Sequence, residues 1–338
     1  MSTSLKVGIV SFAHLHAEAY IGNLRNNPRV EYVGFYDESP ERRAKYGNAF
    51  GSPSFGEWEE FLATGVEAAI VSSENAHHRR DVDALASAGV HVLCEKPLAT
   101  NPADAEAIVR ACKQAGVTLM TAFPMRFSMP LRAAKASLDG GGYGRLTSMI
   151  GRNQGQCPKR HREWFADPDL AGGGAMTDHT VHLTDVYRWF TDREVETVYA
   201  VSNRITYKED TELETGGLVS LTFADGKKAS IDCSWSRPLN YPTWGGLALR
   251  LVTDRGAVDL DAFGQTQRVY GGEAMHTRWD YWGGDANQMM VDEFVAAVAE
   301  GRAPFVTGED GLRAVEVVDA AYRSVKSGKP ERVKRAAV

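Results

Sequence analysis

The sequence has few cysteines, no long apolar run and no surplus of positive charge, and each absence excludes a class of protein. The four cysteines, Cys94, Cys112, Cys157 and Cys233, form no Cys-x-x-Cys pair and predict free thiols in a reducing compartment, with the cytoplasm as the default. No apolar run reaches the ~18 residues of a membrane span. The first apolar segment begins at Lys6, too early to follow a secretory signal. We therefore expect a cytoplasmic protein without a membrane partner.

Charge and composition narrow the class further. The chain carries 38 Lys and Arg against 44 Asp and Glu, a formal charge of −6, whereas a nucleic-acid surface needs clustered basic charge. Hydrophobic residues make up 43% and charged residues 24%, close to the average of globular proteins and unlike a disordered chain. At 338 residues two domains are expected, since single domains usually have about 100–200 residues. Composition thus predicts a globular protein with no nucleic-acid partner and says nothing of its activity.

The first third of the chain alternates short apolar runs with segments of helical spacing. Gly89 and Gly116 stand where helices would end, each just before an apolar run. This alternation with short connections predicts right-handed βαβ units and a doubly wound parallel sheet, whose ligands bind at the carboxyl ends of the strands. The expected strands are 6–10, 30–36, 68–72, 90–94 and 118–122, and the expected helices are 14–25, 40–50, 77–88 and 102–115.

Beyond Phe127 the pattern changes to longer strands of alternating polarity. Asp225-Gly226 between two of them is a hairpin signal, and the segment predicts an open, mostly antiparallel sheet with one covered face. We expect one domain over residues 1–125 and a second α/β domain over 126–338, with a loosely attached polar tail from Lys329. The expected strands are 145–152, 195–205, 218–223, 227–235 and 247–252, and the expected helices are 130–138, 286–300 and 311–326.

The turn after the first strand stands where a dinucleotide-binding fold has its GxGxxG fingerprint. Here the three glycine positions hold Ser11, Ala13 and His16, with Phe12 and His14 between them. Serine and alanine are small enough to keep the backbone near a phosphate, and a helix N-terminus offers free N–H groups. The turn is therefore either a variant phosphate site or an ordinary strand–turn–helix connection.

Asp37 ends the second strand, 21 residues after His16. At this place an acidic residue binds the adenosine ribose 2′-hydroxyl and repels a 2′-phosphate. Glu38 follows where an arginine would favour the 2′-phosphate, so the sequence favours NAD over NADP. The alternative is an ordinary aspartate at the start of a loop, and the spacing favours the functional interpretation.

Glu95-Lys96-Pro97 follows an apolar strand at its carboxyl end. A lysine there can point toward a ligand and polarise a hydroxyl or carbonyl oxygen. A solvated Glu-Lys loop is the alternative.

A run of three glycines, 172–174, leads into a helix that carries Asp178 and His182 one turn apart on one face. Histidine titrates near neutral pH and suits proton transfer with an alcohol, and a carboxylate nearby can orient it or pair with a lysine. A surface Asp–His pair is the alternative. His179, His182 and Asp185 also recur at three-residue intervals, but such positions diverge around a helix, so we predict no metal site.

Together these motifs resemble the Gfo/Idh/MocA family, the group of glucose–fructose oxidoreductase, inositol dehydrogenase and the rhizopine-catabolism proteins. The resemblance covers nearly the whole chain. It implies a Rossmann domain followed by an α/β domain with an open antiparallel sheet, and NAD(P)-linked oxidation or reduction of a sugar or cyclitol hydroxyl. The residues that carry it are the turn after the first strand, Asp37, the segments 73–78, 95–97, 126–127 and 307–312, and the triple glycine with Asp178 and His182.

The resemblance also implies roles for single residues. Lys96, Asp178 and His182 match the family's catalytic positions. Two departures are the missing glycine fingerprint and Glu74 in place of the family's usual proline. In relatives a second subunit covers the open sheet face, so a homodimer or homotetramer is expected. Asn75, Glu95 and Arg126 match positions near the nicotinamide half of the cofactor, and Ser73 and His78 lie in the same matched segments.

We therefore hypothesise hydride transfer to or from nicotinamide, with His182 as general base, Lys96 stabilising the oxyanion and Asp178 holding the two in register. His179 is a further candidate for substrate contact, as are Arg160 and Trp164 in the basic stretch before the triple glycine, although such a stretch is more often solvated. Two alternatives stay open. One is a redox-neutral lyase or glycosidase that retains NAD, and the other is a cofactor-binding sensor without catalysis.

Overall fold

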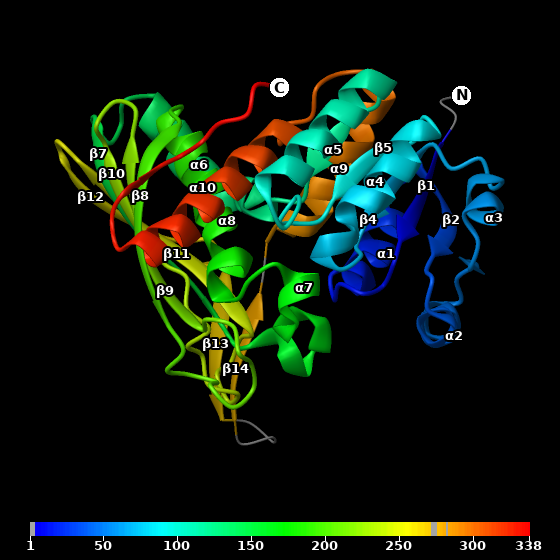
Figure 1. Ribbon diagram of the computed structural model, residues 1–338, viewed down its shortest axis with the longest axis horizontal. Helices are drawn as coiled ribbons and strands as arrows, with labels where there is room; N and C mark the ends of the chain where they lie inside the picture. The colour runs from blue at the N-terminus through cyan, green and yellow to red at the C-terminus, as the bar shows by residue number, and fades with distance from the viewer. Residues whose placement is uncertain (1–3, 272–275, 282) are drawn as a thin grey trace.

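The computed structural model describes residues 4–271, 276–281 and 283–338. Figure 1 shows two lobes side by side, one built on the N-terminal half of the chain and one on the sheet that follows it. Long helices from the C-terminal part of the chain run beside both lobes. Each lobe contains its own sheet, which confirms the predicted fold class.

The first sheet is parallel throughout and has the strand order β3-β2-β1-β4-β5-β6. This is the doubly wound order, in which the direction of winding reverses between β1 and β4 and a ligand binds beyond their carboxyl ends. Its strands are β1 (Leu5–Val10), β2 (Val30–Tyr36), β3 (Ser54–Phe55), β4 (Ala68–Val71), β5 (His91–Cys94) and β6 (Leu119–Thr121). Its helices are α1 (Ala17–Asn26), α2 (Pro40–Phe50), α3 (Trp58–Leu62), α4 (His78–Ser87) and α5 (Pro102–Ala115).

Capping residues explain which helix bounds the sequence predicted well. The Ser39 side chain accepts a hydrogen bond from the Arg42 N–H at the start of α2, and the Asn101 side chain caps α5 in the same way. Each of these helices has proline in its first turn and a left-handed glycine after its end, so both match their predicted ranges. In contrast, α1 begins three residues later than expected, because His14 and His16 belong to the turn before it.

The second sheet has the order β12-β11-β7-β10-β9-β8-β15 and is mixed, since β7 and β10 run parallel while the other pairs are antiparallel. Helices α8 and α10 pack on one of its faces. The strands are β7 (Leu146–Gly155), β8 (Val195–Asn203), β9 (Gly216–Phe223), β10 (Lys228–Asp232), β11 (Gly245–Thr253), β12 (Gly256–Asp261) and β15 (Glu331–Arg332), and β13 (Thr266–Gly271) pairs separately with β14 (His276–Tyr281). The helices of this half are α6 (Met129–Asp139), α7 (Pro168–Ala171), α8 (Ala175–Thr191), α9 (Ala286–Glu300) and α10 (Gly308–Ser327).

Helix α9 packs against the first lobe although it comes late in the chain. Its Met290 and Phe294 are buried in one cluster with Ile21 of α1. The Asn27 Nδ2 atom, just beyond α1, donates to Asp292 at 2.8 Å. The predicted division near residue 125 therefore separates the two sheets, whereas α9 belongs by its packing to the first lobe.

The prediction of a loose C-terminal tail is wrong. Strand β15 pairs with β8, and the Ala336 N–H donates to the buried carboxylate of Glu316 at 2.6 Å. Arg313 in turn donates to the Ala336 carbonyl oxygen. The tail is polar in sequence, but its backbone satisfies buried charged groups of α10, and this fixes it to the surface.

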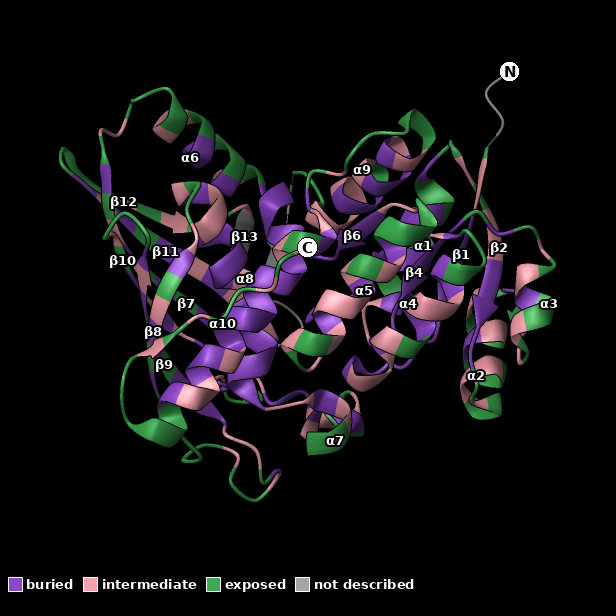
Figure 2. Ribbon diagram, turned by 45° about the horizontal axis from the view of Figure 1, so that its top comes forward, coloured by how far each residue is buried: buried purple, intermediate pink, exposed green. Residues whose placement is uncertain are grey.

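Buried residues line the inside of both lobes (Figure 2), and most of these buried residues are apolar. The four cysteines are buried and form no disulfide. Within the described ranges, we find no helix with the length and apolar character that crossing a membrane requires.

Candidate active site

A cavity of about 700 Å³ lies between the two lobes. Ligand pockets of small-molecule enzymes typically have about 300–1,000 Å³. Its lining includes His16, Lys96, Asp178, His179 and His182 on one side, with Met129, Asn153, Trp244, Gln265 and Asn287 among the other residues around it.

Helix α8 and the end of β5 bring the first of these residues together. The Lys96 Nζ atom lies 2.6 Å from Asp178 Oδ1 and donates to the Asp178 carbonyl oxygen at 3.3 Å. The Trp235 indole N–H donates to Asp178 Oδ2 at 3.0 Å. All three side chains are buried, so the ion pair is held in one geometry. The structure thus gathers Lys96 and Asp178, which the sequence separates by 82 positions.

The glycine run before α8 is required by close packing. A Cβ atom at Gly174 would lie 2.1 Å from the Glu214 carbonyl oxygen, and one at Gly173 would lie equally close to the Tyr322 hydroxyl. Gly173 also has a φ of 150°, which L-residues rarely adopt. The N-terminus of α8 can therefore approach Glu214 only with glycine at these positions.

The charged groups at this site and their burial determine the protonation states of Asp178 and His182. Burial opposes ionisation of Asp178, but the Lys96 ammonium, His179 and the hydrogen bonds outweigh it and hold the pKa of Asp178 well below its usual value. Burial lowers the pKa of His182 well below 6.5, and the nearby Lys96 ammonium lowers it further. At neutral pH the site therefore holds a Lys96–Asp178 ion pair beside a neutral His182 imidazole.

His179 lies on the other side of Asp178. Its Nε2 atom is 3.2 Å from Asp178 Oδ2, and its Nδ1 atom is 3.1 Å from the Cys233 carbonyl oxygen. Burial lowers the pKa of His179, so the neutral ring donates to one of these oxygens at a time.

The turn after β1 keeps the backbone of a glycine fingerprint without the glycines. Ser11 has a φ of 69°, the left-handed conformation that glycine adopts readily. Its hydroxyl donates to Asp37 Oδ2 at 3.3 Å and accepts from the Ala13 N–H at 3.1 Å, which stabilises the turn.

His16 at the third glycine position is bound to Glu95. The His16 Nδ1 atom lies 2.8 Å from Glu95 Oε1, and the Tyr20 hydroxyl donates to the same oxygen. The His14 ring lies 3.8 Å from this oxygen and is buried. Burial opposes ionisation of Glu95, but the two histidines and Lys96 hold its pKa well below its usual value. Glu95 therefore holds the turn after β1 in place, in addition to any contact with a cofactor.

The same three residues, His14, His16 and Glu95, are close enough to share a cation, and so are Glu38, Glu74 and His77. Over the described residues, His179, His182 and Asp185 form no such cluster.

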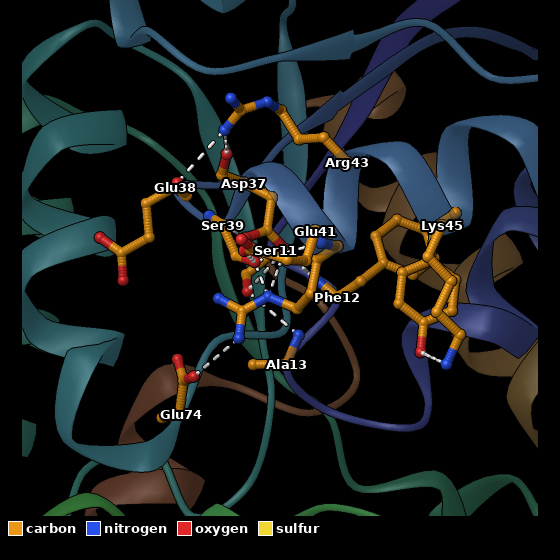
Figure 3. Close-up of polar contacts among 12 residues, drawn as sticks. Ser11, Phe12, Ala13, Asp37, Glu38, Ser39, Glu41, Arg43, Lys45 and Glu74 are labelled. Atoms are coloured by element: carbon orange, nitrogen blue, oxygen red, sulfur yellow. Dashed lines mark hydrogen bonds and ion pairs between the residues drawn. The ribbon is translucent and has the colours of Figure 1, made fainter.

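Asp37 is bonded more extensively than the sequence suggested. Its carboxylate accepts from the Phe12 N–H at 2.8 Å and from the Ser39 N–H at 2.9 Å (Figure 3). The Arg42 Nε atom lies 2.9 Å from each of its oxygens. Sequence analysis missed Arg42, although the Ser39 cap that positions the Arg42 backbone is a readable signal.

The loop after β4 joins the two lobes. The Asn75 Nδ2 atom donates to the Ala171 carbonyl oxygen of α7 at 2.9 Å. Both ring nitrogens of His78 face carbonyl oxygens, those of Pro97 and Ser73, so His78 fastens two loops together. The Ser73 hydroxyl and the Asn75 side-chain oxygen are buried and have no hydrogen-bond partner among the described residues.

Of the predicted site residues, only His16, Lys96, Asp178, His179 and His182 belong to the cavity lining, and Arg126, Arg160 and Trp164 are among those outside it. Arg126 is buried and pairs with Asp185 at 2.6 Å and with Asp310 at 2.9 Å. Arg160 is exposed. The Trp164 indole N–H donates to the Ala13 carbonyl oxygen at 3.0 Å.

Trp164 therefore contacts the turn after β1, and a neighbour does the same. The Arg162 Nε atom donates to the same Ala13 oxygen at 3.0 Å, and its Nη2 atom contacts Glu18. The sequence predicts that this stretch, Arg162 included, either contacts a substrate carboxylate or phosphate or is a solvated loop. It does not predict the contact of Arg162 with the turn, because nothing local shows which distant carbonyl the side chain meets.

Comparison with known proteins agrees with this architecture. Residues 5–123 match the model of the oxidoreductase family with an NAD-binding Rossmann fold, and residues 131–259 match that of the GFO/IDH/MocA C-terminal domain. The chain therefore belongs to the Gfo/Idh/MocA family. It is an NAD(P)-dependent oxidoreductase of the dehydrogenase type.

Two curated relatives and one solved structure illustrate the similarity. The chain is 28% identical to D-xylose 1-dehydrogenase (NADP(+)) 2 of Haloferax volcanii, over 85% of this chain and 87% of that one. It is 28% identical to myo-inositol 2-dehydrogenase of Thermotoga maritima, over 77% of this chain and 78% of that one. The structure of GenD2 from gentamicin A biosynthesis in complex with NAD is 24% identical, covers 99% of this chain and 98% of that chain, and superposes with a TM-score of 0.88.

Proposed function

We propose that the protein transfers a hydride between nicotinamide and a secondary hydroxyl of a sugar, cyclitol or sugar-derived substrate. The observation that carries the proposal is the buried Lys96–Asp178 ion pair beside the neutral His182 in the wall of the cavity. Relatives named for xylose and inositol support the substrate class.

The residues around the carboxyl ends of β1, β2 and β4 fit a nicotinamide dinucleotide. Ser11 and Ala13 are small and keep the turn in its left-handed conformation, so the backbone can approach a pyrophosphate. Beyond β4, the unpartnered Ser73 hydroxyl would donate to a phosphate or ribose oxygen, and the unpartnered Asn75 side-chain oxygen would accept from a ribose hydroxyl. When bound there, the nucleotide supplies the carbon that accepts or returns the hydride.

This chain's own residues would handle the proton and the charge. The neutral His182 takes the hydroxyl proton of the substrate. The Lys96 ammonium stabilises the negative charge that develops on the same oxygen. Asp178, fixed by Trp235, holds Lys96 in place and keeps the local charge balanced.

We also propose that NAD is preferred over NADP. Two carboxylates, Asp37 and Glu74, stand at the ends of β2 and β4 where an adenosine ribose would bind, and they repel a 2′-phosphate. The relatives differ in this respect, because one is named for NADP(+) while the similar solved structure contains NAD.

A panel of sugars, cyclitols and sugar acids with NAD and NADP tests the proposal. Nicotinamide absorbance and product mass should be followed together. Reduction of NAD with a product two hydrogens lighter supports it. Bond cleavage without net change in absorbance, or no binding of either nucleotide, contradicts it.

The pH profile should report His182. Because its pKa lies well below 6.5 and only the neutral imidazole accepts a proton, activity should fall only as the pH drops well below 6.5. The measurement is kcat/KM for substrate oxidation against pH. His182→Asn should lose this acidic limb together with most of the rate. An acidic limb at or above pH 6.5 would assign the base to another group.

We propose a homo-oligomer formed through the open face of the second sheet. In the strand register Ile150 and Tyr199 lie in one row across β7, β10, β9 and β8, and Leu218 and Val201 lie in the next. All four are exposed apolar side chains on the face opposite α8 and α10. Leu218, Val201 and Tyr199 adjoin one another, whereas Ser230, Ser220 and Asp232 separate Ile150 from them. Exposed apolar side chains gathered on one face of a sheet suit a second copy of the chain.

Leu218→Asp should therefore shift the protein toward smaller species in sedimentation velocity, because it puts a charge into the centre of this face. Ile205→Asp is the matched control, since Ile205 is also exposed but lies beyond the end of β8. A wild-type protein that sediments as a monomer would refute the proposed oligomer.

We further propose a cytoplasmic location. The four cysteines are buried and unpaired. Free thiols of this kind are typical of a reducing compartment. Fractionation of cells that express the protein tests this, and recovery outside the cytoplasm would contradict it.

A further inference from the structure

The carboxylate of Asp37 has no exposed surface to offer a nucleotide. The side chain is completely buried. Its two oxygens together accept from the Ser11 hydroxyl, the Phe12 and Ser39 N–H groups and the Arg42 Nε–H. A carboxylate with this many donors has little capacity left for a ribose hydroxyl. The Arg42 side chain, which pairs with this carboxylate, is 26% exposed.

Arg42 is held from a second side by Glu74. The Arg42 Nη1 atom lies 3.2 Å from Glu74 Oε1, and the other oxygen of Glu74 is 3.2 Å from His77 Nδ1. Asp37 and Glu74 come from the loops after β2 and β4, and they pair with different nitrogens of this arginine, Asp37 with Nε and Glu74 with Nη1. Glu74 is the residue that stands where the resemblance places the family's usual proline, and a proline would supply no carboxylate here.

The other charges nearby are also engaged. The Arg43 Nη1 atom donates to the backbone carbonyl oxygens of Asp37 and Glu38, and Arg80 pairs with Glu38 and with Asp81. None of these contacts involves Arg42. The carboxylates that pair with Arg42 are therefore Asp37 and Glu74, whereas the Glu38 carboxylate lies within 4.8 Å of Glu74 and pairs with Arg80.

An arginine in this position without a second carboxylate would favour a 2′-phosphate, because a guanidinium binds phosphate with charge and paired N–H donors. Of the Arg42 N–H groups, Asp37 accepts only from Nε–H, whereas Glu74 accepts from Nη1 and adds a negative charge that opposes a dianion. We propose that Glu74 sets the preference for NAD over NADP by holding and neutralising Arg42. This inference rests on the proposed function, since it supposes that a nicotinamide nucleotide binds at this edge of the sheet.

The test is the ratio of nucleotide affinities in Glu74→Gln, measured by titrating NAD and NADP separately against tryptophan fluorescence without any substrate. Removing one charge a few ångströms from a phosphate should lower the Kd of NADP relative to that of NAD by about tenfold. The Glu41→Gln variant is the matched control. Glu41 lies beside Arg42 on α2, is exposed and contacts Ser39, so its loss should leave the ratio nearly unchanged.

The double variant Arg42→Met/Glu74→Gln should lose the gain in NADP affinity, because the freed guanidinium is what attracts the phosphate. Thermal denaturation shows whether each variant is folded. Three outcomes would overturn the inference: a wild-type preference for NADP, an unchanged ratio in folded Glu74→Gln, or an equal shift in Glu41→Gln. If wild-type protein binds neither nucleotide, the proposed function itself fails.

Discussion

Replacing Lys96 with methionine should lower kcat by about a thousandfold, the upper range for loss of one group that stabilises a developing oxyanion. Methionine has a similar length but no charge, so the substrate oxygen would lose its cationic partner. The nicotinamide nucleotide should still bind, since its proposed contacts lie mainly at the turn after β1 and at Asn75. Steady-state kinetics and fluorescence titration of NAD measure the two effects separately.

The same substitution leaves the buried carboxylate of Asp178 without its ion-pair partner, which can destabilise the fold by about 3–5 kcal/mol. The double variant Lys96→Met/Asp178→Asn removes both charges and should recover stability without recovering activity. Lys135→Met is the matched control, because Lys135 is a buried lysine paired with Asp139 outside the cavity lining. A Lys96→Met protein with wild-type kcat would disprove the assigned role.

Replacing Arg126 with methionine should lower the free energy of unfolding by about 3–5 kcal/mol, the cost of breaking a buried ion pair from one side. Arg126 contacts Asp185 and Asp310 and also donates to the Phe305 carbonyl oxygen. Burial already raises the pKa of Asp185 to about 6 against the pull of Arg126. Without the guanidinium, the two carboxylates would face each other, with Arg188 paired to Asp310.

Denaturant unfolding measures this loss, with Arg250→Met as the control. Arg250 pairs with Asp259 at the surface, where both side chains are more than half exposed, so its loss should leave the free energy of unfolding nearly unchanged. The sequence assigned Arg126 to the nicotinamide site, whereas its contacts assign it to the fold. Unchanged stability together with a weaker affinity for NAD would favour the sequence prediction.

The elements that the sequence predicted well carry their own local signals. Pro40 and Gly51 mark the ends of α2, and Asn101 and Gly116 mark those of α5. The parallel pairing of β7 with β10 and the short strand β15 have no such signal, because they depend on which distant backbone becomes the neighbour. The sequence therefore predicts a mostly antiparallel second sheet without showing which pair of strands is parallel.

The contacts of the candidate site also fall into those that the sequence predicts and those that it does not. The contact of Lys96 with Asp178 could be expected because each stands in a recognisable motif at the end of a strand or the start of a helix. The contacts of Arg42 with Glu74 and of Arg162 with Ala13 could not be expected. The first joins α2 to the loop after β4 within the first lobe, and the second joins the two lobes, so each depends on how distant segments pack.

The return of α9 to the first lobe has a consequence for how the chain is made. A protein is synthesised from its N-terminus, so β1 and α1 leave the ribosome long before Met290 and Phe294, which cover Ile21 and Leu24. Until those late residues arrive, one apolar face of the nascent nucleotide-binding lobe stays open to water and to other chains. The lobe that is translated first is therefore among the last to complete its interior, and stopping synthesis early would leave it unfinished rather than independent.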